Sequence, residues 1–244
     1  MILEEAAARL QTLIDTHDRI VFFGGAGVST ESGIPDFRSQ DGLYNMKYRY
    51  PPETIISHSF FVREPEEFWR FYRDKMLITD AEPNAAHRKL AELEAAGRLT
   101  AVITQNIDGL HQKAGSRHVA ELRGSVLRNY CLSCHRFYDG DFVRQAPGTI
   151  PRCPVCGGMI KPDVVLYEEG LDDAVIEDAV TAIRQADLLI IGGTSLVVYP
   201  AAGLIDYFRG DTIVLINKGA TSRDDSADLV IREPIGEVMA RIRV

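Results

Sequence analysis

The chain has 244 residues, of which 45% are hydrophobic and 25% charged, the composition of an ordinary soluble globular protein. Its 27 basic and 35 acidic residues give a net charge of −8, which argues against general affinity for nucleic acid or for anionic membranes. No apolar run is long enough to span a bilayer, and the N-terminus lacks the pattern of a signal peptide. We therefore expect a cytoplasmic protein whose four cysteines are thiolates and form no disulfides.

The first third of the chain contains several helices and one buried strand. Apolar residues at helical spacing predict a helix over 3–16, and aromatic and β-branched residues predict a strand over 19–23. The polar, tyrosine-rich residues 40–52 predict a loop, either a lid beside a ligand site or a plain surface connection. An aromatic helix is predicted over 65–76, with its aromatic stripe in the core, and an amphipathic helix over 83–96.

Strands and helices alternate along the rest of the chain. Strands are predicted over 99–104, 187–191, 212–216 and 227–231, and helices over 172–185 and 201–208. This alternation predicts an α/β fold with a doubly wound, mostly parallel sheet of the Rossmann-like kind. Several polar or glycine positions directly follow predicted strands, at the sheet edge where such folds bind ligands: Gly25, Gln105, Thr194 and Asn217.

A glycine turn, Gly25-Ala26-Gly27, follows the first predicted strand. A strand, a glycine turn and a helix start form an anion site because free N–H groups and the positive helix end face the phosphates. The third glycine of the usual G-x-G-x-x-G pattern is absent, since position 30 is Thr. No carboxylate follows at a strand end about twenty residues on, where a hydride-transfer enzyme holds its ribose. These features favour NAD that is bound for chemistry other than hydride transfer.

The cysteines form two Cys-x2-Cys pairs, Cys131 with Cys134 and Cys153 with Cys156, separated by residues 135–152. This spacing is typical of a tetrahedral zinc site. Because all four ligand positions are filled by cysteine, the site is expected to be structural and not catalytic. Residues 126–160 contain four arginines and two aspartates, too weak a basic character for a nucleic-acid-binding zinc ribbon.

Two long motifs resemble the hallmarks of one family. The segment 25–39, GAGVSTESGIPDFRS, and the segment 104–111, TQNIDGLH, look like the two signatures of the sirtuins, NAD-consuming protein deacylases. The match continues to Asn217-Lys218-Gly219 and covers nearly the whole chain. The resemblance implies an NAD-dependent protein-lysine deacetylase, a transferase or hydrolase in reaction class, that moves the acyl group to ADP-ribose. It also implies a structural zinc ion, acyl-lysine proteins as substrates, and no nucleic-acid or membrane partner.

The resemblance divides the chain into three parts. Residues 1–39, 80–125 and 161–244 are expected to form the Rossmann-like NAD-binding domain. Residues 40–79 are expected to form the helical and cofactor-loop part of a smaller inserted domain, and residues 126–160 its zinc module. The active cleft is expected between the larger and the smaller domain.

Site residues are implied along both motifs and at later strand ends. The phosphate loop supplies the cofactor contacts Gly25, Ala26, Gly27, Ser29, Asp36, Phe37 and Arg38, with Phe37 shielding the ribose. Gln105 and Asn106 are implied near the ribose, where Asn106 positions water or a hydroxyl, and Ile107 and Asp108 form the nicotinamide pocket. The adenosine half is assigned to Gly193, Thr194, Ser195, Asn217 and Lys218. The alternative interpretation of Asp108 is a solvated turn acid before Gly109.

Substrate contacts are implied for the extended segment 161–168, whose family counterpart pairs with the substrate peptide as an added strand. The alternative is an ordinary strand, which Pro162 disfavours at a central position. Val164 and Val165, together with Phe37, would form an apolar tunnel for the acyl-lysine stem. Tyr72 begins a Tyr-Arg-Asp-Lys segment that departs at its last residue from the Tyr-x-x-Arg motif of sirtuins preferring acidic acyl groups. We therefore expect acetyl and other neutral short acyl groups.

The family's proton acceptor is a histidine in a Leu-His-Gly motif, but this chain has Leu122-Arg123-Gly124. An arginine, with a pKa above about 12, cannot accept a proton near pH 7. His111 is expected to be structural, and His118 would need a shifted strand to reach the cleft. The sequence therefore predicts a deacylase architecture with impaired turnover. Two alternatives stay open: an NAD-cleaving ADP-ribosyltransferase or NAD glycohydrolase, and an inactive protein that binds NAD and acyl-lysine.

Overall fold

The computed structural model describes residues 2–37, 42–43 and 48–244. Arg38 and residues 40–41 and 44–47 of the loop predicted over 40–52 lie outside the described residues. Within the described part, no helix combines the length and the apolar content needed to cross a bilayer.

A six-stranded parallel sheet forms the larger part of the molecule, with the strand order β3-β2-β1-β7-β8-β9. Its strands are β1 (Ile20–Gly24), β2 (Leu99–Thr104), β3 (Val119–Glu121), β7 (Leu188–Gly192), β8 (Thr212–Ile216) and β9 (Leu229–Ile231). The order reverses between β1 and β7, and open α/β sheets bind ligands at the carboxyl edge beside such a reversal. The predicted doubly wound α/β fold is confirmed.

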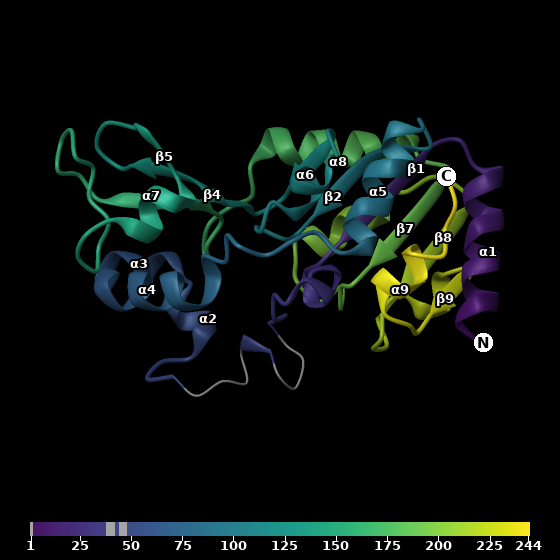
Figure 1. Cartoon of the computed structure of the whole chain (residues 1–244), viewed down its shortest axis with the longest axis horizontal. Helices are drawn as coiled ribbons and strands as arrows, with labels where there is room; N and C mark the ends of the chain where they lie inside the picture. Colours follow the sequence, from purple (N-terminus) through teal and green to yellow (C-terminus); the bar gives the residue numbers. More distant parts are fainter. Residues whose placement is uncertain (1, 38–41, 44–47) are drawn as a thin grey trace.

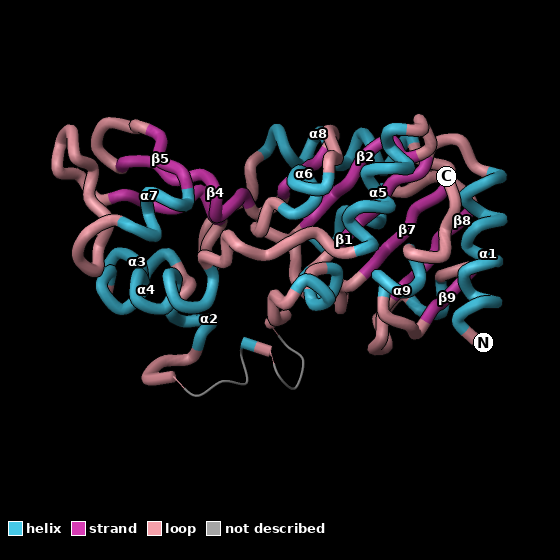
Figure 2. Tube along the Cα trace, in the orientation of Figure 1, coloured by secondary structure: helices cyan, strands magenta, loops and turns pink. Residues whose placement is uncertain are grey.

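Helices cover both faces of this sheet, as Figure 2 shows. One face packs against α1 (Leu3–Thr16), α5 (Ala85–Ala95) and α9 (Ile235–Met239), and the other against α8 (Asp173–Gln185) and the 3-10 helix η5 (Ala201–Tyr207). Neighbouring strand residues point to opposite faces, so Phe22 belongs to the first core and Phe23 to the second. A short helix, α6 (Leu110–Ala114), packs against α5.

A smaller lobe lies at the opposite end of the molecule from the two termini (Figure 1). It contains an antiparallel sheet of β4 (Gly124–Cys131), β5 (Phe137–Asp139) and β6 (Ile160–Val164). Around this sheet lie α2 (Pro52–Ile55), α3 (His58–Arg63), α4 (Pro65–Phe71), the π-helical turn η4 (Tyr72–Met76) and α7 (Gly140–Gln145). A third core fills the lobe, and the aromatic stripe of α4 and η4 is buried in it, as predicted.

The structure differs from the sequence expectation in its helix details. The predicted helix start after the glycine turn is instead two 3-10 turns, η1 (Ala26–Val28) and η2 (Thr30–Ser32). Gly33 ends the second turn with a φ of 82°, and Pro35 follows closely, so no regular α-helix can continue there. The predicted aromatic helix changes to π geometry after Phe71. Strand β6, which contains Pro162, is an edge strand of its sheet, the position that proline tolerates.

Candidate functional site

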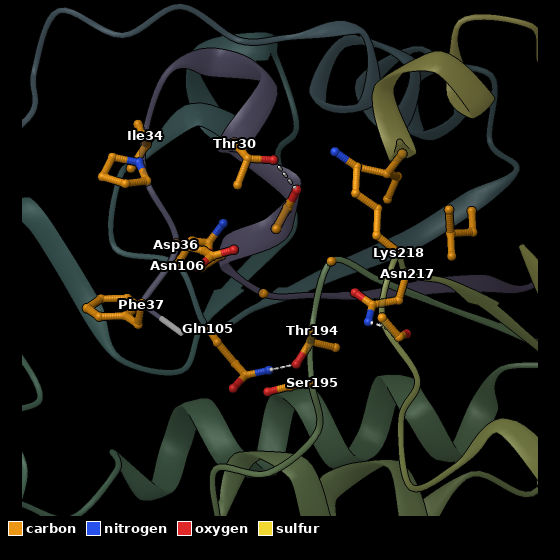
Figure 3. Close-up of a pocket in the computed structure, with 18 of the residues that line it drawn as sticks. Thr30, Ile34, Asp36, Phe37, Gln105, Asn106, Thr194, Ser195, Asn217 and Lys218 are labelled. Atoms are coloured by element: carbon orange, nitrogen blue, oxygen red, sulfur yellow. Dashed lines mark hydrogen bonds between the residues drawn. The ribbon is translucent and has the colours of Figure 1, made fainter. Parts of the chain in front are cut away.

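A cavity of about 680 Å³ opens at the carboxyl ends of β1, β2, β7 and β8. Figure 3 shows its polar side chains converging from these separate strand ends. The predicted site residues that line it are Gly25, Ala26, Gly27, Asp36, Phe37, Gln105, Asn106, Arg123, Gly193, Thr194, Ser195, Asn217 and Lys218. Its volume is within the range of small-molecule and cofactor sites. We call it the large cavity.

The floor of the large cavity is made by two loops in backbone contact. The N–H of Gly27 donates to the carbonyl of Gly193 at 2.8 Å, and the N–H of Gly25 donates to the carbonyl of Gly192 at 3.1 Å. A Cβ on Gly27 would lie 2.8 Å from the Cα of Gly193, which itself has a φ of 59°. Glycine is therefore required at these positions by the close packing of the two loops.

The walls of the large cavity carry oriented amide and hydroxyl groups. Gln105 Nε2 donates to Thr194 Oγ1 at 3.1 Å, and Asn217 Nδ2 donates to the carbonyl of Gly219 at 2.9 Å (Figure 3). Sequence reasoning missed other lining residues, namely Thr30, Glu31, Ile34, Pro35, Val197, Val198, Glu233 and Ile235. Thr30, Glu31, Ile34 and Pro35 lie inside the first motif and could have been found from it, whereas the others carry no comparable signal.

A second, narrower cavity of about 90 Å³ adjoins the first, and we call it the small cavity. Seven residues line both cavities: Ala26, Ile34, Pro35, Phe37, Gln105, Asn106 and Arg123. The small cavity is also lined by the predicted residues Ser29, Ile107, Asp108, Val164 and Val165. Helices and loops of the smaller lobe contribute residues that were not predicted: Leu43, Ile56, Lys75, Met76 and Ile78. The predicted substrate segment 161–168 adds Leu166 and Tyr167. The small cavity is thus a mainly apolar space with a polar end.

Asp108 is held at that polar end by a hydrogen-bond network. Ser29 Oγ donates to Asp108 Oδ2 at 2.6 Å and accepts from Asn106 Nδ2 at 3.1 Å. The N–H of Leu110 donates to Asp108 Oδ1 at 2.9 Å. Burial raises the pKa of Asp108, although the hydrogen bonds from Ser29 and Leu110 oppose the rise. Asp108 is therefore not a solvated turn acid, and its carboxylate can accept a hydrogen bond from a ligand amide.

Arg123 lies at the junction of the two cavities, between β3 and β4. Its Nε is buried and has no hydrogen-bond partner among the described residues. Neither nearby histidine lines a cavity. His111 is fully buried against the ring of His87, and burial lowers its pKa well below the ordinary value. His118 forms a solvent-exposed pair with Asp178 of α8, so the expectation that neither histidine replaces the missing base agrees with the geometry.

Tyr72 is the predicted substrate contact that does not line a cavity. Its ring stacks on Phe68 and meets Trp69 edge-on in the core of the smaller lobe, and its side chain is fully buried. Burial raises its pKa, and its hydroxyl has no hydrogen-bond partner among the described residues. Lys75, from the same turn, lines the small cavity instead.

The four cysteines converge in the smaller lobe, with all four Sγ atoms within 4.8 Å of one another. Cys131 Sγ lies 3.4 Å from Cys156 Sγ, and Cys134 Sγ lies 3.6 Å from Cys153 Sγ. Four thiolates around a tetrahedral zinc are about 3.8 Å apart, from Zn–S bonds of about 2.3 Å. The donor set and its spacing therefore fit a structural zinc site, and none of the four cysteines lines either cavity.

These features define a nucleotide-binding α/β protein. Its large cavity, at the carboxyl edge of the parallel sheet, adjoins a small cavity that is lined in part by a lobe with four clustered cysteines. The model of the Sir2 family matches residues 25–200. The chain belongs to the Sir2 family.

Curated relatives cover the full length of the chain. An NAD-dependent protein deacetylase of Clostridium acetobutylicum is 57% identical over 99% of this chain and 100% of its own length. Another, of Clostridium perfringens, is 58% identical over 98% of this chain and 99% of its own length. A solved Sir2 with a p53 peptide and NAD+ has a TM-score of 0.85 and 38% identity, covering 99% of this chain and 97% of its own. A histidine-to-alanine Sir2 variant with deacetylated p53 peptide and 3′-O-acetyl ADP ribose covers the same shares, with 38% identity and a TM-score of 0.89.

Proposed function

We propose that this protein is an NAD-dependent protein-lysine deacetylase that binds NAD in the large cavity and an acyl-lysine side chain in the small one. The observation that carries this proposal is the continuity of the two cavities through Phe37, Asn106 and Arg123. An acyl group in the small cavity can thereby meet a ribose in the large one. The names and bound ligands of the relatives support the same assignment.

The residues of the two cavities divide the task. The glycine turn at Gly25 and Gly27 faces the dinucleotide phosphates, and the adenosine half is held by Gly193, Thr194, Ser195, Asn217 and Lys218. Asp108 accepts a hydrogen bond from the nicotinamide amide, while Phe37 and Ile107 exclude water from the ribose. When bound, NAD would supply the ribose carbon that takes the acyl oxygen as its bond to nicotinamide breaks and nicotinamide leaves. Water then releases the lysine amine and the acyl group stays on ADP-ribose, so the reaction combines transfer with hydrolysis. A cytoplasmic location, where thiols stay reduced, is part of the same proposal.

The peptide is proposed to lie along residues 161–168 and to pair with the backbone as an added strand. Val164, Val165 and Leu166 line the small cavity and provide an apolar wall for the lysine stem. Acetyl and neutral short acyl groups are the proposed substrates.

Arg123 is proposed to leave this chain with strongly reduced turnover, because a guanidinium cannot accept the proton that a ribose hydroxyl must lose. Replacing the residue in Arg123→His should raise the rate of deacetylation of an acetyl-lysine peptide, followed by mass spectrometry, by at least about a hundredfold. Arg123→Ala is the matched control, since it removes the charge without adding a base, and it should gain far less than Arg123→His. Equal rates in the parent protein and Arg123→His would refute the role given to position 123.

Arg123 favours two other functions, because neither of them needs a proton acceptor at position 123. One is NAD cleavage with ADP-ribosyl transfer or hydrolysis, and the other is binding of NAD and acyl-lysine without turnover. Measuring nicotinamide release with and without acetyl-peptide separates all three. Release without peptide indicates glycohydrolase or ADP-ribosyltransferase activity. Binding of both ligands with no release indicates a non-catalytic protein.

A further inference from the structure

Arg128 joins the two sheets of the molecule through its side chain. The residue lies in β4 of the smaller lobe, and its Nη1 donates to Glu121 Oε2 at 2.6 Å. Its Nε donates to Asp163 Oδ2 at 2.7 Å. Glu121 is the last residue of β3 in the parallel sheet, whereas Asp163 lies in β6 of the antiparallel sheet. We call these three residues the Arg128 brace.

The Arg128 brace surrounds the point where the chain crosses from one sheet to the other. Only Leu122 and Arg123 separate β3 from β4. The carbonyl of Arg123 accepts from the N–H of Val165 at 3.0 Å, and the N–H of Val126 donates to the carbonyl of Ile107 at 2.9 Å. Arg123, Ile107 and Val165 all line the small cavity, so this crossover forms part of its wall.

The burial of one carboxylate, that of Glu121, distinguishes the Arg128 brace from an ordinary surface ion pair. The Glu121 side chain is only 8% exposed, compared with 38% for Arg128 and 42% for Asp163. Removing the arginine would leave the buried Glu121 carboxylate without its cation, which is far more unfavourable than losing an exposed pair. One guanidinium also fixes two carboxylates in a defined relative position, because its N–H groups are held in a rigid fork.

We propose that Arg128 is a positioning residue that sets the relative position of the two sheets at the small cavity, and thereby controls binding of the acyl-lysine peptide. The peptide part of this inference rests on the proposed function. Arg128 lines neither cavity, so it acts through Arg123, Ile107 and Val165. The adenosine end of the large cavity, at Asn217 and Lys218, belongs to β8 and its following loop and should be insensitive to the brace.

The test compares Arg128→Met with Arg144→Met. Arg144 forms a 2.7 Å pair with Asp141 inside α7 of the same lobe, so its replacement removes an arginine–carboxylate pair that joins no sheets. By calorimetric titration, Arg128→Met should weaken binding of an acetyl-lysine peptide about tenfold and change NAD affinity less than about twofold. Arg144→Met should change neither. Arg128→Lys, which keeps the charge but loses the fork, should fall between Arg128→Met and the parent protein.

Amide hydrogen exchange supplies a readout that needs no ligand. Exchange at Val126 and Val165 should accelerate in Arg128→Met and stay unchanged in Arg144→Met. Unchanged exchange, or faster exchange with unaltered peptide affinity, would overturn the positioning role, as would an equal loss of NAD and peptide affinity. If the parent protein binds no acetyl-peptide, the proposed function fails by that result, and exchange alone decides whether the brace holds the crossover.

Discussion

Ser29 and Asp108 illustrate how single side chains of this site depend on their neighbours. The Ser29 hydroxyl accepts from Asn106 and donates to Asp108, so one small residue fixes the orientation of two polar groups. Because the Asp108 carboxylate is partly buried, each of these hydrogen bonds is stronger than it would be in water. The first motif therefore supplies a serine whose main partners belong to the second motif, which explains why both motifs are needed for one polar end of the small cavity.

His118 gives a prediction for the dependence of stability on pH. Its Nδ1 faces the carbonyl of Thr100 at 2.9 Å and its Nε2 faces Asp178 Oδ2 at 2.9 Å, so the doubly protonated ring satisfies both acceptors. Burial lowers the pKa of His118, but hydrogen bonding to Asp178 and the charge of Asp178 outweigh it, and the net shift is upward from 6.5. The pair therefore stabilises the fold fully below pH 6.5, and this stability is lost as the pH rises through the raised pKa.

Melting temperatures measured across this pH range should fall less steeply in Asp178→Asn than in the parent protein. Glu177→Gln is the control, since it removes the adjacent exposed charge on α8 and should leave the pH profile unchanged. Parallel profiles for the parent protein and Asp178→Asn would show that the pair does not contribute.

At the scale of elements, Gly124 connects the two sheets with a geometry that no other residue can adopt. Its φ is 72°, and a Cβ would lie 1.9 Å from the carbonyl oxygen of Asp163 in β6. Gly124→Ala should therefore lower the free energy of unfolding by about 3 kcal/mol or more, because backbone strain and a displaced strand combine. The measurement is urea denaturation of both proteins.

Gly148→Ala separates the two effects, because Gly148 has a φ of 74° and nothing within 4 Å of the added Cβ. It should destabilise by only about 1 kcal/mol, from strain alone. If the two variants lose equal stability, the close approach to Asp163 is not what requires glycine at position 124.

The elements that could be predicted from sequence are those with a clear period or composition. Strands β1, β2, β7 and β8 are mainly apolar runs, and α1, α5 and α8 have apolar residues at helical spacing. The antiparallel sheet was missed because β4 is interrupted by a register shift between Ser125 and Asn129, and β5 has only three residues. The cleft between the parallel sheet and the smaller lobe was expected only from the resemblance to a known family. The domain boundaries that this resemblance implies stay predictions.

The residues of the candidate site also fall into a group that could be predicted from the sequence and a group that could not. Residues inside the two motifs were predicted because the motifs are long, and those of them that the structure describes line the cavities. The lobe side of the small cavity, including Ile56 and Met76, could not be predicted, since it depends on how α2 and η4 pack against the segment after β6. Tyr72 was assigned as a substrate contact from its position in a family motif, and this assignment does not predict the direction of its side chain. The Tyr72 side chain is buried in the lobe core, whereas Lys75 lines the small cavity.

At the scale of the whole molecule, the smaller lobe has its own hydrophobic core, so it can lose its packing while the parallel sheet stays folded. Cys131 and Cys153 belong to the same core as the aromatic residues of α4, and that core shares no residue with the two cores flanking the parallel sheet. A structural zinc in such a site contributes on the order of 10 kcal/mol to folding, more than a small lobe can replace by apolar burial alone. Metal loss should therefore loosen the lobe before it affects the sheet.

Trp69, the single tryptophan of the chain, is fully buried in the lobe core and reports on this directly. Removing metal with a strong chelator should shift its fluorescence emission to the red, whereas the far-ultraviolet circular dichroism, dominated by the helices of the larger part, should change little. Cys134→Ser should produce the same red shift without chelator, because it removes one exposed ligand of the site.

Metal loss should also affect ligand binding, because residues of the lobe form most of the small-cavity wall that lies outside the two motifs. The affinity for the acetyl-lysine peptide should fall as the Trp69 emission shifts to the red, and the affinity for NAD should fall less. An unchanged Trp69 emission after metal removal, or simultaneous loss of the emission and the helical signal, would mean that the lobe is not stabilised separately by its metal.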